Sequence, residues 1–237
     1  MNLFSYLLDP VNWTGTQGIP ARLVEHLGYV ALTLVIALVI AVPIGAWIGH
    51  TGRGGFLAVG LANGLRALPT LGLLVLIVGA TGLGLIGPIV ALVILAVPPI
   101  LAGTYAGVRN VDPAVVDAAR GMGMRGREVL LGVELPNALP LIIGGIRSSV
   151  LQVISTATIA AYVALGGLGR FIIDGLSIRD FPQMIAGSLL VALLAVVADL
   201  LLAGLQKLVV SPGLRAAPAT RRLRVVPSKA PDAARAA

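Results

Sequence analysis

The sequence predicts an all-α, polytopic membrane protein with about five transmembrane helices. Hydrophobic residues fill 57% of the 237 positions, charged residues fill only 11%, and the mean hydropathy is +0.99. In a soluble domain roughly a quarter of the residues are charged, and most of these lie on the surface. The 17 basic and 10 acidic side chains are too few to cover a water-exposed surface of this size. The composition therefore excludes a soluble enzyme.

Runs without charge place the first three spans. A helix needs about 20 mainly apolar residues to cross the hydrocarbon core of a bilayer. The 27 residues between Glu25 and Arg53 contain no Asp, Glu, Lys or Arg and predict one helix. The next such run, 67–108, has 42 residues and a glycine-rich stretch in its middle, so it predicts two helices joined by a turn. The resulting spans are 27–49, 60–80 and 85–106.

The last two spans follow from the same pattern further along the chain. The uncharged run 148–169 supplies most of a fourth helix over 141–164. The apolar residues on both sides of Asp199 supply a fifth helix over 183–206. An even number of spans would require residues 3–20 to enter the membrane, and the acidic and proline residues of that segment argue against it.

Basic residues set the predicted orientation. The loop 107–140 and the segment after the fifth span together carry eleven Lys and Arg residues, whereas the opposite side carries three. Because basic residues concentrate in cytoplasmic loops, the loop and the C-terminus are predicted inside and the N-terminus outside. Segment 1–22 is then extracytoplasmic; it has no basic residue ahead of its apolar residues, so it is a poor signal peptide and the first span is an uncleaved anchor.

The C-terminal segment 208–237 is basic and rich in Ala and Pro, which predicts a disordered cytoplasmic tail. Two interpretations of its charge stay open: it marks the cytoplasmic side, or it also contacts anionic lipid headgroups.

No metal or cofactor site is expected on this chain, and no catalytic residues are assigned. There is no cysteine, and His26 and His50 lie in no metal-ligand spacing. Aromatic residues are 4%, too few for a surface that stacks nucleic-acid bases, so the net charge of +7 is attributed to topology rather than to nucleic-acid binding.

The cytoplasmic loop 107–140 is much longer than a simple connection between two spans requires. Asp112 before Pro113 predicts a helix start, with a short helix over 114–120 that Gly121 or Gly123 ends in a left-handed cap. A second short helix is predicted over about 125–133, and a proline at position 136 is expected to break the chain before the fourth span. A loop of this length and order predicts docking to another protein.

The same loop carries a motif that resembles one found in the inner-membrane permease subunits of ABC importers. The family motif reads Glu-Ala-Ala, three residues, Gly, nine residues, Ile, one residue, Leu-Pro. This sequence matches its spacing without a gap and replaces the first Glu by Asp and the Ile by Val. The matching residues are Asp117, Ala118, Ala119, Gly123, Val133, Leu135 and Pro136. Gly121 lies two residues before Gly123, the glycine of the motif.

The resemblance extends along the core, residues 23–207. Arg66-Ala-Leu-Pro-Thr is similar to an Arg-x-[Leu/Ile]-Pro element of these permeases, and Gly166-Gly167-Leu168-Gly169 is similar to their external Gly-Gly-Leu-Gly segment. Together with the segments 108–113 and 160–162, these features resemble the importers of osmoprotectants, namely glycine betaine, choline, carnitine or proline.

The resemblance implies the fold of a type I ABC importer permease in the bacterial inner membrane. It implies a coupling loop around Asp117 seated on a cytoplasmic ATPase, where Asp117 would cap backbone N–H groups or meet a basic residue of the partner. The chain contains no G-x-x-x-x-G-K-[ST] phosphate loop, so ATP and Mg would bind to separate ATPase subunits. A second permease copy or homologue and an extracytoplasmic solute-binding protein are the other implied partners.

Three charged residues fall inside the predicted spans at a similar depth on the cytoplasmic side: Arg66, Arg147 and Asp199. Because an isolated charge is costly in a bilayer, we expect Asp199 to pair with Arg147 or Arg66, closing the inner end of the pathway or anchoring the bundle. The alternative is that each arginine snorkels to the interface. At the outer end, Gly166, Gly167 and Gly169 form a candidate gate, with ordinary turn glycines as the alternative.

Two other readings of the function stay open. The chain could import another amino acid or a cationic metabolite, or it could be a secondary transporter driven by an ion gradient. A secondary transporter more often has an acidic residue at mid-membrane and an internal repeat, and the sequence shows neither. A membrane-embedded enzyme is disfavoured because the spans contain no paired carboxylates, histidine cluster or Ser/His/Asp set.

Overall fold

The computed structural model describes residues 5–163 and 165–210, with backbone alone for Leu57, Leu61 and Arg66. All regular structure in these ranges is helical. Four helices are long and apolar enough to cross a membrane, and a bent pair of shorter helices makes up to five spans. The all-α fold with about five spans is thereby confirmed. The long helices are α2 (Ile19–Thr51), α5 (Ile86–Arg109), α8 (Leu135–Ala160) and α10 (Phe181–Val209).

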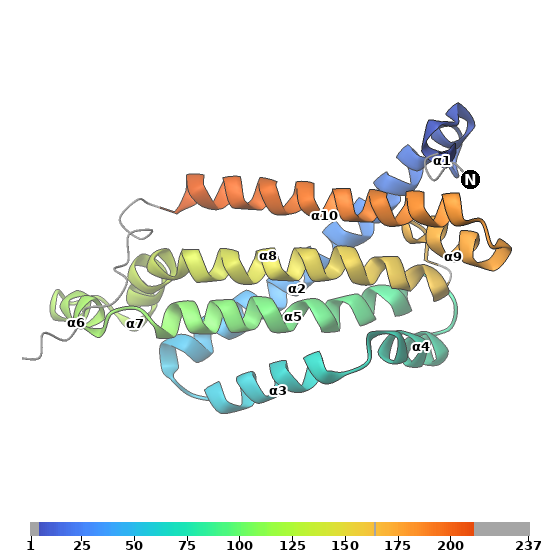
Figure 1. The fold of residues 1–237 in the computed structure, drawn as a ribbon. Helices are drawn as coiled ribbons and strands as arrows, with labels where there is room; N and C mark the ends of the chain where they lie inside the picture. The colour runs from blue at the N-terminus through green and yellow to red at the C-terminus, as the bar shows by residue number, and fades with distance from the viewer. Residues whose placement is uncertain (1–4, 164, 211–237) are drawn as a thin grey trace, which may run out of the picture.

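The second span differs from the expected straight helix over 60–80. It consists of α3 (Gly55–Ala67) and α4 (Thr70–Thr81), which meet at an angle of 92° (Figure 1). Leu68, at the break, has an extended backbone with φ −68° and ψ 135°. The next residue is Pro69, whose ring disfavours the helical conformation at the preceding residue and which has no N–H to donate. The prediction of one continuous helix was therefore wrong at this point.

The first span begins earlier than the expected residue 27. Helix α2 starts at Ile19, with Pro20 in the first turn, where its missing N–H costs nothing. Arg22 and Glu25, of which Glu25 bounds the uncharged run in the sequence, lie within the first turns of this helix and form an ion pair at 2.8 Å. Charge therefore marked the limit of the apolar stretch and not the limit of the helix.

The core lies where α2, α5 and α8 pack together, and it is built from small and branched side chains such as Ala37, Ala41, Ala96 and Ile154. Helices α5 and α8 approach each other backbone to backbone. A Cβ atom on Gly103 would lie only 2.7 Å from the carbonyl oxygen of Leu141. Small residues at such crossings permit the close van der Waals packing that holds helices together in lipid.

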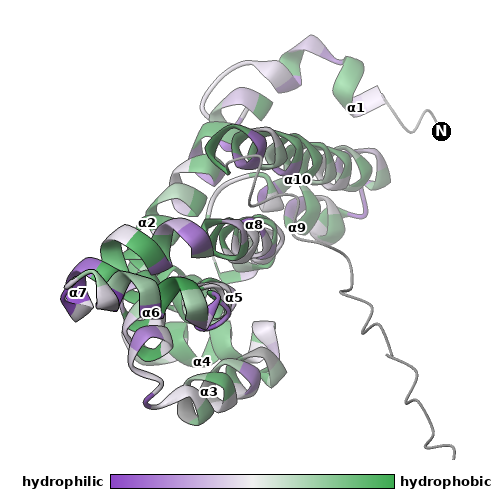
Figure 2. Ribbon diagram, turned by 90° about the vertical axis from the view of Figure 1, so that its left-hand side faces the viewer, coloured by the Kyte–Doolittle hydropathy of each residue, from purple (hydrophilic) through white to green (hydrophobic). Residues whose placement is uncertain are grey.

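Short helices sit at the two ends of this bundle. At one end lie α6 (Pro113–Gly121) and α7 (Gly126–Val129), and at the other lie α1 (Ser5–Leu8) and α9 (Gly169–Ile178) (Figure 1). Figure 2 shows hydrophobic residues along the long helices and hydrophilic residues gathered on α6 and α7. Large apolar side chains of α10, including Leu193, Leu200 and Leu201, are more than half exposed, as expected of a helix that faces lipid.

Candidate functional site

The first short helix of the loop 107–140, α6, is held by a cap at its start. The Asp112 carboxylate accepts a hydrogen bond from the backbone N–H of Ala114 at 2.9 Å, and Pro113 occupies the first turn. This arrangement satisfies one of the N–H groups that a helix start leaves without an intrahelical partner. The helix start lies where the Asp-Pro pair indicates.

The end of α6 is fixed by Gly123, which has a φ of +88°. The Gly123 N–H donates to the carbonyl of Arg120 at 2.9 Å, and the Met124 N–H donates to the carbonyl of Ala119 at 3.2 Å. These two bonds form a Schellman motif, in which the residue after the cap adopts the left-handed conformation. Of the two candidate glycines, Gly123 therefore has this role, and Gly121 is the last residue of the helix.

The motif residues on α6 point in different directions. Ala119 is 2% exposed and packs into the loop, whereas Asp117 and Ala118 are exposed. The Asp117 carboxylate lies 3.9 Å from the Arg120 guanidinium at the surface. No hydrogen bond from a described backbone N–H reaches Asp117, since Asp112 supplies the cap. Asp117 and Ala118 thus form a free face, and Ala119 belongs to the loop's own packing.

The second half of the loop runs into α8 without a break, which corrects the expectation that Pro136 interrupts the chain. Residues Gly126–Val163 form one helical stretch of 38 residues. Within it, Leu130–Glu134 are a π-helix, which we call the π segment. A proline ring clashes with the carbonyl four residues earlier in an α-helix. Here that carbonyl belongs to Gly132, inside the wider π turn, so Pro136 is accommodated.

Sequence reasoning missed a buried pair that joins this segment to α2. The Nδ1 atom of His50, at the end of α2, lies 2.5 Å from Oε2 of Glu134 in the π segment. Glu134 is 4% exposed. The two residues are 84 positions apart, and neither spacing nor composition links them. A clue was available only in retrospect: Glu134 is an acidic residue inside an otherwise apolar stretch of the motif.

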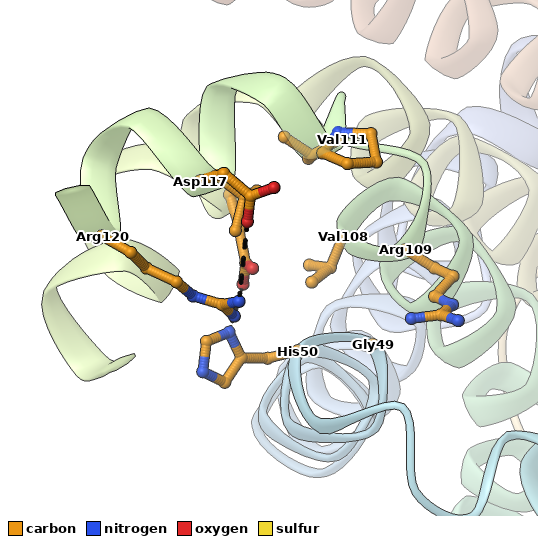
Figure 3. A pocket seen from close by; sticks show the side chains of 10 residues that line it. Gly49, His50, Val108, Arg109, Val111, Asp117 and Arg120 are labelled. Carbon is orange, nitrogen blue, oxygen red and sulfur yellow. Dashed lines mark hydrogen bonds and ion pairs between the residues drawn. The ribbon is translucent and has the colours of Figure 1, made fainter. Parts of the chain in front are cut away.

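A cavity of about 180 Å³ opens beside this pair. Its wall combines the last turn of α2, the end of α5 and the exposed helix α6, as Figure 3 shows with Asp117 and Arg120 on one side and His50 below. Within residues 5–163 and 165–210, no three His, Asp or Glu side chains gather closely enough to hold a metal ion. The cavity therefore lies between the ends of two long helices and the loop.

Two of the three charged residues predicted within the spans lie together. The Arg147 guanidinium on α8 donates from Nη2 to Oδ2 of Asp199 on α10 at 2.6 Å, and from Nε to the other carboxylate oxygen. Such a two-point contact is the strongest form of the Arg–carboxylate pair. The side chain of Arg66 lies outside the described part of the structure.

The glycines of the segment 166–169 are packed tightly against α2 and α8. The Gly167 N–H donates to Oε2 of Glu25 at 2.9 Å, and its φ is +83°. A Cβ on Gly166 would lie 2.5 Å from the same carboxylate oxygen, and one on Gly169 would lie 2.3 Å from the carbonyl of Thr158. The positive φ of Gly167 and the backbone carbonyl beside Gly169 favour glycine at these two positions, whereas Gly166 meets only the end of the Glu25 side chain within the described residues. In this structure the segment is packed against the first turns of α2.

Comparison with known proteins assigns the family. Residues 41–211 match the family described as binding-protein-dependent transport system inner membrane component. The chain belongs to this family. It is therefore a membrane-integral permease component of a transport system, as the loop motif indicated.

Curated relatives of the permease cover most of both chains. The permease is 35% identical over 191 residues to the glycine betaine/carnitine/choline transport system permease protein OpuCB of Bacillus subtilis (strain 168). This match covers 81% of this chain and 88% of the relative. The permease is 35% identical to the carnitine transport permease protein OpuCB of Listeria monocytogenes, covering 77% and 84%. It is 33% identical to the osmoprotectant import permease protein OsmW of Salmonella typhimurium (strain LT2), covering 91% and 100%.

A solved structure confirms the fold of the permease. A chain of the inward-facing MetNI methionine ABC transporter aligns with a TM-score of 0.74 and 21% identity, covering 86% of this chain and 99% of that one. At this level of identity the likeness concerns the fold alone. The type I importer permease architecture expected from the loop motif is thus present.

Proposed function

We propose that the permease moves a small osmoprotectant, such as glycine betaine, choline, carnitine or proline, into the cell as part of an ATP-driven importer. The names of its relatives support this class of solute, since they transport glycine betaine, carnitine or choline. The observation that carries the proposal is the preformed helix α6, capped at both ends, with Asp117 and Ala118 exposed at one end of the bundle.

The proposed complex contains two cytoplasmic ATPase subunits, which bind ATP and Mg, and a second permease copy or a homologue. The exposed face of α6 would contact an ATPase subunit, and the buried Ala119 would keep the helix seated on its own loop. An extracytoplasmic solute-binding protein would deliver the solute at the end formed by α1 and α9. Basic residues support this orientation, because Arg109, Arg120, Arg125 and Arg127 lie at the α6 end.

We further propose roles for the two contacts inside the bundle. The Arg147–Asp199 pair anchors α10 to α8 near the cytoplasmic end, and the segment Gly166–Gly169 acts as the outer gate, which must leave Glu25 to open. The tail 208–237, nearly all of it outside the described residues, is proposed to lie on the cytoplasmic side and to contact anionic lipid.

Affinity purification from native membranes in mild detergent tests the complex. Recovery of an ATPase with a phosphate loop, followed by ATP-dependent uptake of labelled glycine betaine, choline, carnitine or proline in proteoliposomes, is the expected result. Uptake of only another amino acid or cationic metabolite would replace the solute class. If the chain purifies alone and moves solute without ATP, it is a secondary transporter and the proposal is wrong.

A further inference from the structure

Helix α2 makes a polar contact near each of its ends. One contact is to the segment directly before α8, and the other is to the segment that follows α8. At the cytoplasmic end His50 contacts Glu134 of the π segment, which leads directly into α8. At the outer end Glu25 accepts the N–H of Gly167, in the segment that follows α8. Helices α2 and α8 are therefore tied together at both ends, and sliding of one along the other breaks a tie.

The cytoplasmic contact, which we call the inner tie, lies beside the cavity and between two parts of the loop. Glu134 is buried, and its carboxylate would lose its hydrogen-bond partner if His50 moved away, which is costly in a buried site. On the other side of the imidazole, a Cβ on Gly126 would lie 3.4 Å from Nε2 of His50. The imidazole is therefore held between the start of α7 and the π segment, so a displacement of the loop carries the end of α2 with it.

The outer contact, which we call the outer tie, is the hydrogen bond between Glu25 and Gly167. The Glu25 carboxylate bonds both the Gly167 N–H at 2.9 Å and the Arg22 guanidinium at 2.8 Å. The next residue, His26, is fully buried and contacts the carbonyl of Ile154 on α8 through Nε2 at 3.1 Å. The outer end of α2 is thus fixed to α8 and to the glycine segment together.

The element between the two ties is one continuous helix. Positions 25 and 50 are 25 residues apart, a separation of about 38 Å along an α-helix. Between them α2 packs along α5, where a Cβ on Gly45 would lie 2.9 Å from Cβ of Thr104. Chains of packed side chains and rigid helices of this kind can carry coupling between distant sites.

We propose that α2 is a second transmission element, which works in parallel with α8 and couples the position of the cytoplasmic loop to the outer glycine segment through the two ties. This inference rests on the proposed function, since it assumes that an ATPase displaces the loop. His50, Glu134 and Glu25 are positioning residues in this scheme. Breaking either tie leaves α8 as the sole route and lowers the coupling between the two sides of the membrane.

The test uses the whole importer in proteoliposomes, with the ATPase subunits and binding protein that copurify with the permease. The binding protein is loaded with a mixture of glycine betaine, choline, carnitine and proline. The readout is the ratio of ATP hydrolysis with and without loaded binding protein. The inner tie is removed by His50→Leu with Glu134→Leu, the outer tie by Glu25→Leu, and a third protein combines all three changes.

Matched controls keep the ties and change a neighbour. Thr51→Val alters a hydroxyl that donates to the Trp47 carbonyl within α2, and Ser155→Ala removes a hydroxyl that donates to the Leu151 carbonyl within α8. Glu134→Gln and Glu25→Gln retain an acceptor oxygen and are expected to stay near wild type. If the Leu variants do not assemble, His50→Ser with Glu134→Gln and Glu25→Ser break the same contacts and are judged by the same criteria.

Each broken tie is expected to reduce the stimulation at least about fivefold, the lower end of typical coupling between sites, while basal ATP hydrolysis persists. The combined variant should lose no more of this stimulation than the more impaired of the two single-tie variants, because both ties act through the same helix. A smaller loss from either tie, or a combined loss equal to the product of the two, overturns the proposal, since distant independent sites are additive. A wild-type importer without ATP-dependent uptake would instead refute the proposed function.

Discussion

Arg147 on α8 and Asp199 on α10 meet in a two-point contact, with Nη2 of the arginine 2.6 Å from Oδ2 of the aspartate. The residues are 52 positions apart, and both lie in helices long enough to span the membrane. A charge within a bilayer is stabilised by an opposite charge at close range. The contact therefore ties the last long helix to the centre of the bundle.

Removing one member of this pair is expected to destabilise the protein. Asp199→Asn or Arg147→Gln leaves the remaining polar group without its charged partner, so the melting temperature in detergent should fall. The exchange Arg147→Asp with Asp199→Arg should recover part of the loss. Ser148→Ala serves as the control, because its hydroxyl bonds only the Gly144 carbonyl of the same helix. An exchange no more stable than the single variants would argue against pairing as the source of stability.

Neighbouring alanines of α6 should respond differently to arginine. Ala118→Arg adds a long side chain to the exposed face and should abolish ATPase association and uptake while leaving the melting temperature unchanged. Ala119→Arg forces a charge into a position that is 2% exposed and should lower stability as well as uptake. Co-purification of the ATPase measures association and a thermal melt measures stability, so together they distinguish the effects of the two variants. Normal ATPase recovery with Ala118→Arg would show that this face is not the docking surface.

The end of α6 predicts a contrast between two glycines. Gly123→Val places a branched side chain at a φ of +88°, a left-handed conformation that costs about 1–2 kcal/mol for ordinary residues. Transport should be lost although membrane insertion persists. Gly121→Ala should be tolerated, because a Cβ there meets nothing within 4 Å. Uptake assays with membrane-fraction blots check both, and equal effects would contradict the assigned cap.

The outer segment predicts sensitivity to a single methyl group. Gly169→Ala places a Cβ 2.3 Å from the backbone carbonyl oxygen of Thr158, so the segment must move away from α8 and uptake should fall severalfold. Gly204→Ala on α10 meets nothing within 4 Å and should behave as wild type. Labelled-solute uptake in vesicles makes the comparison. Equal uptake by the two variants would mean that the closed segment is not required for transport.

Much of the fold was predictable because a bilayer imposes a simple rule on composition. Uncharged runs located every long helix, although the rule misjudged ends where charged residues find partners, as Arg22 and Glu25 do. The break before Pro69 was predictable from the sequence, although one continuous helix was wrongly expected there, since proline restricts the residue before it. The accommodation of Pro136 was not, because it depends on the π segment that precedes it.

The candidate site was predictable only where its geometry is local. Asp112 acts on residues within a few positions, so the start of α6 follows from spacing, whereas the choice between Gly121 and Gly123 at its end required the structure. The exposure of Ala118 and the burial of Ala119 depend on how the loop packs, which the motif alone does not determine. The His50–Glu134 contact requires the tertiary structure, since it joins two ends of the bundle's helices that are remote in the chain.

The backbone contact between α5 and α8 has a consequence for how fast the importer assembles. These two helices carry the loop at its two ends, and Gly103 and Gly145 bring them together with no side chain between. The loop is therefore held at both ends by two helices that pack tightly together. The proposed docking helix, α6, is already folded. Association then requires little additional ordering of the chain, and the cost in conformational entropy is small. Subunit encounter, rather than refolding of the loop, would set the rate at which the complex forms.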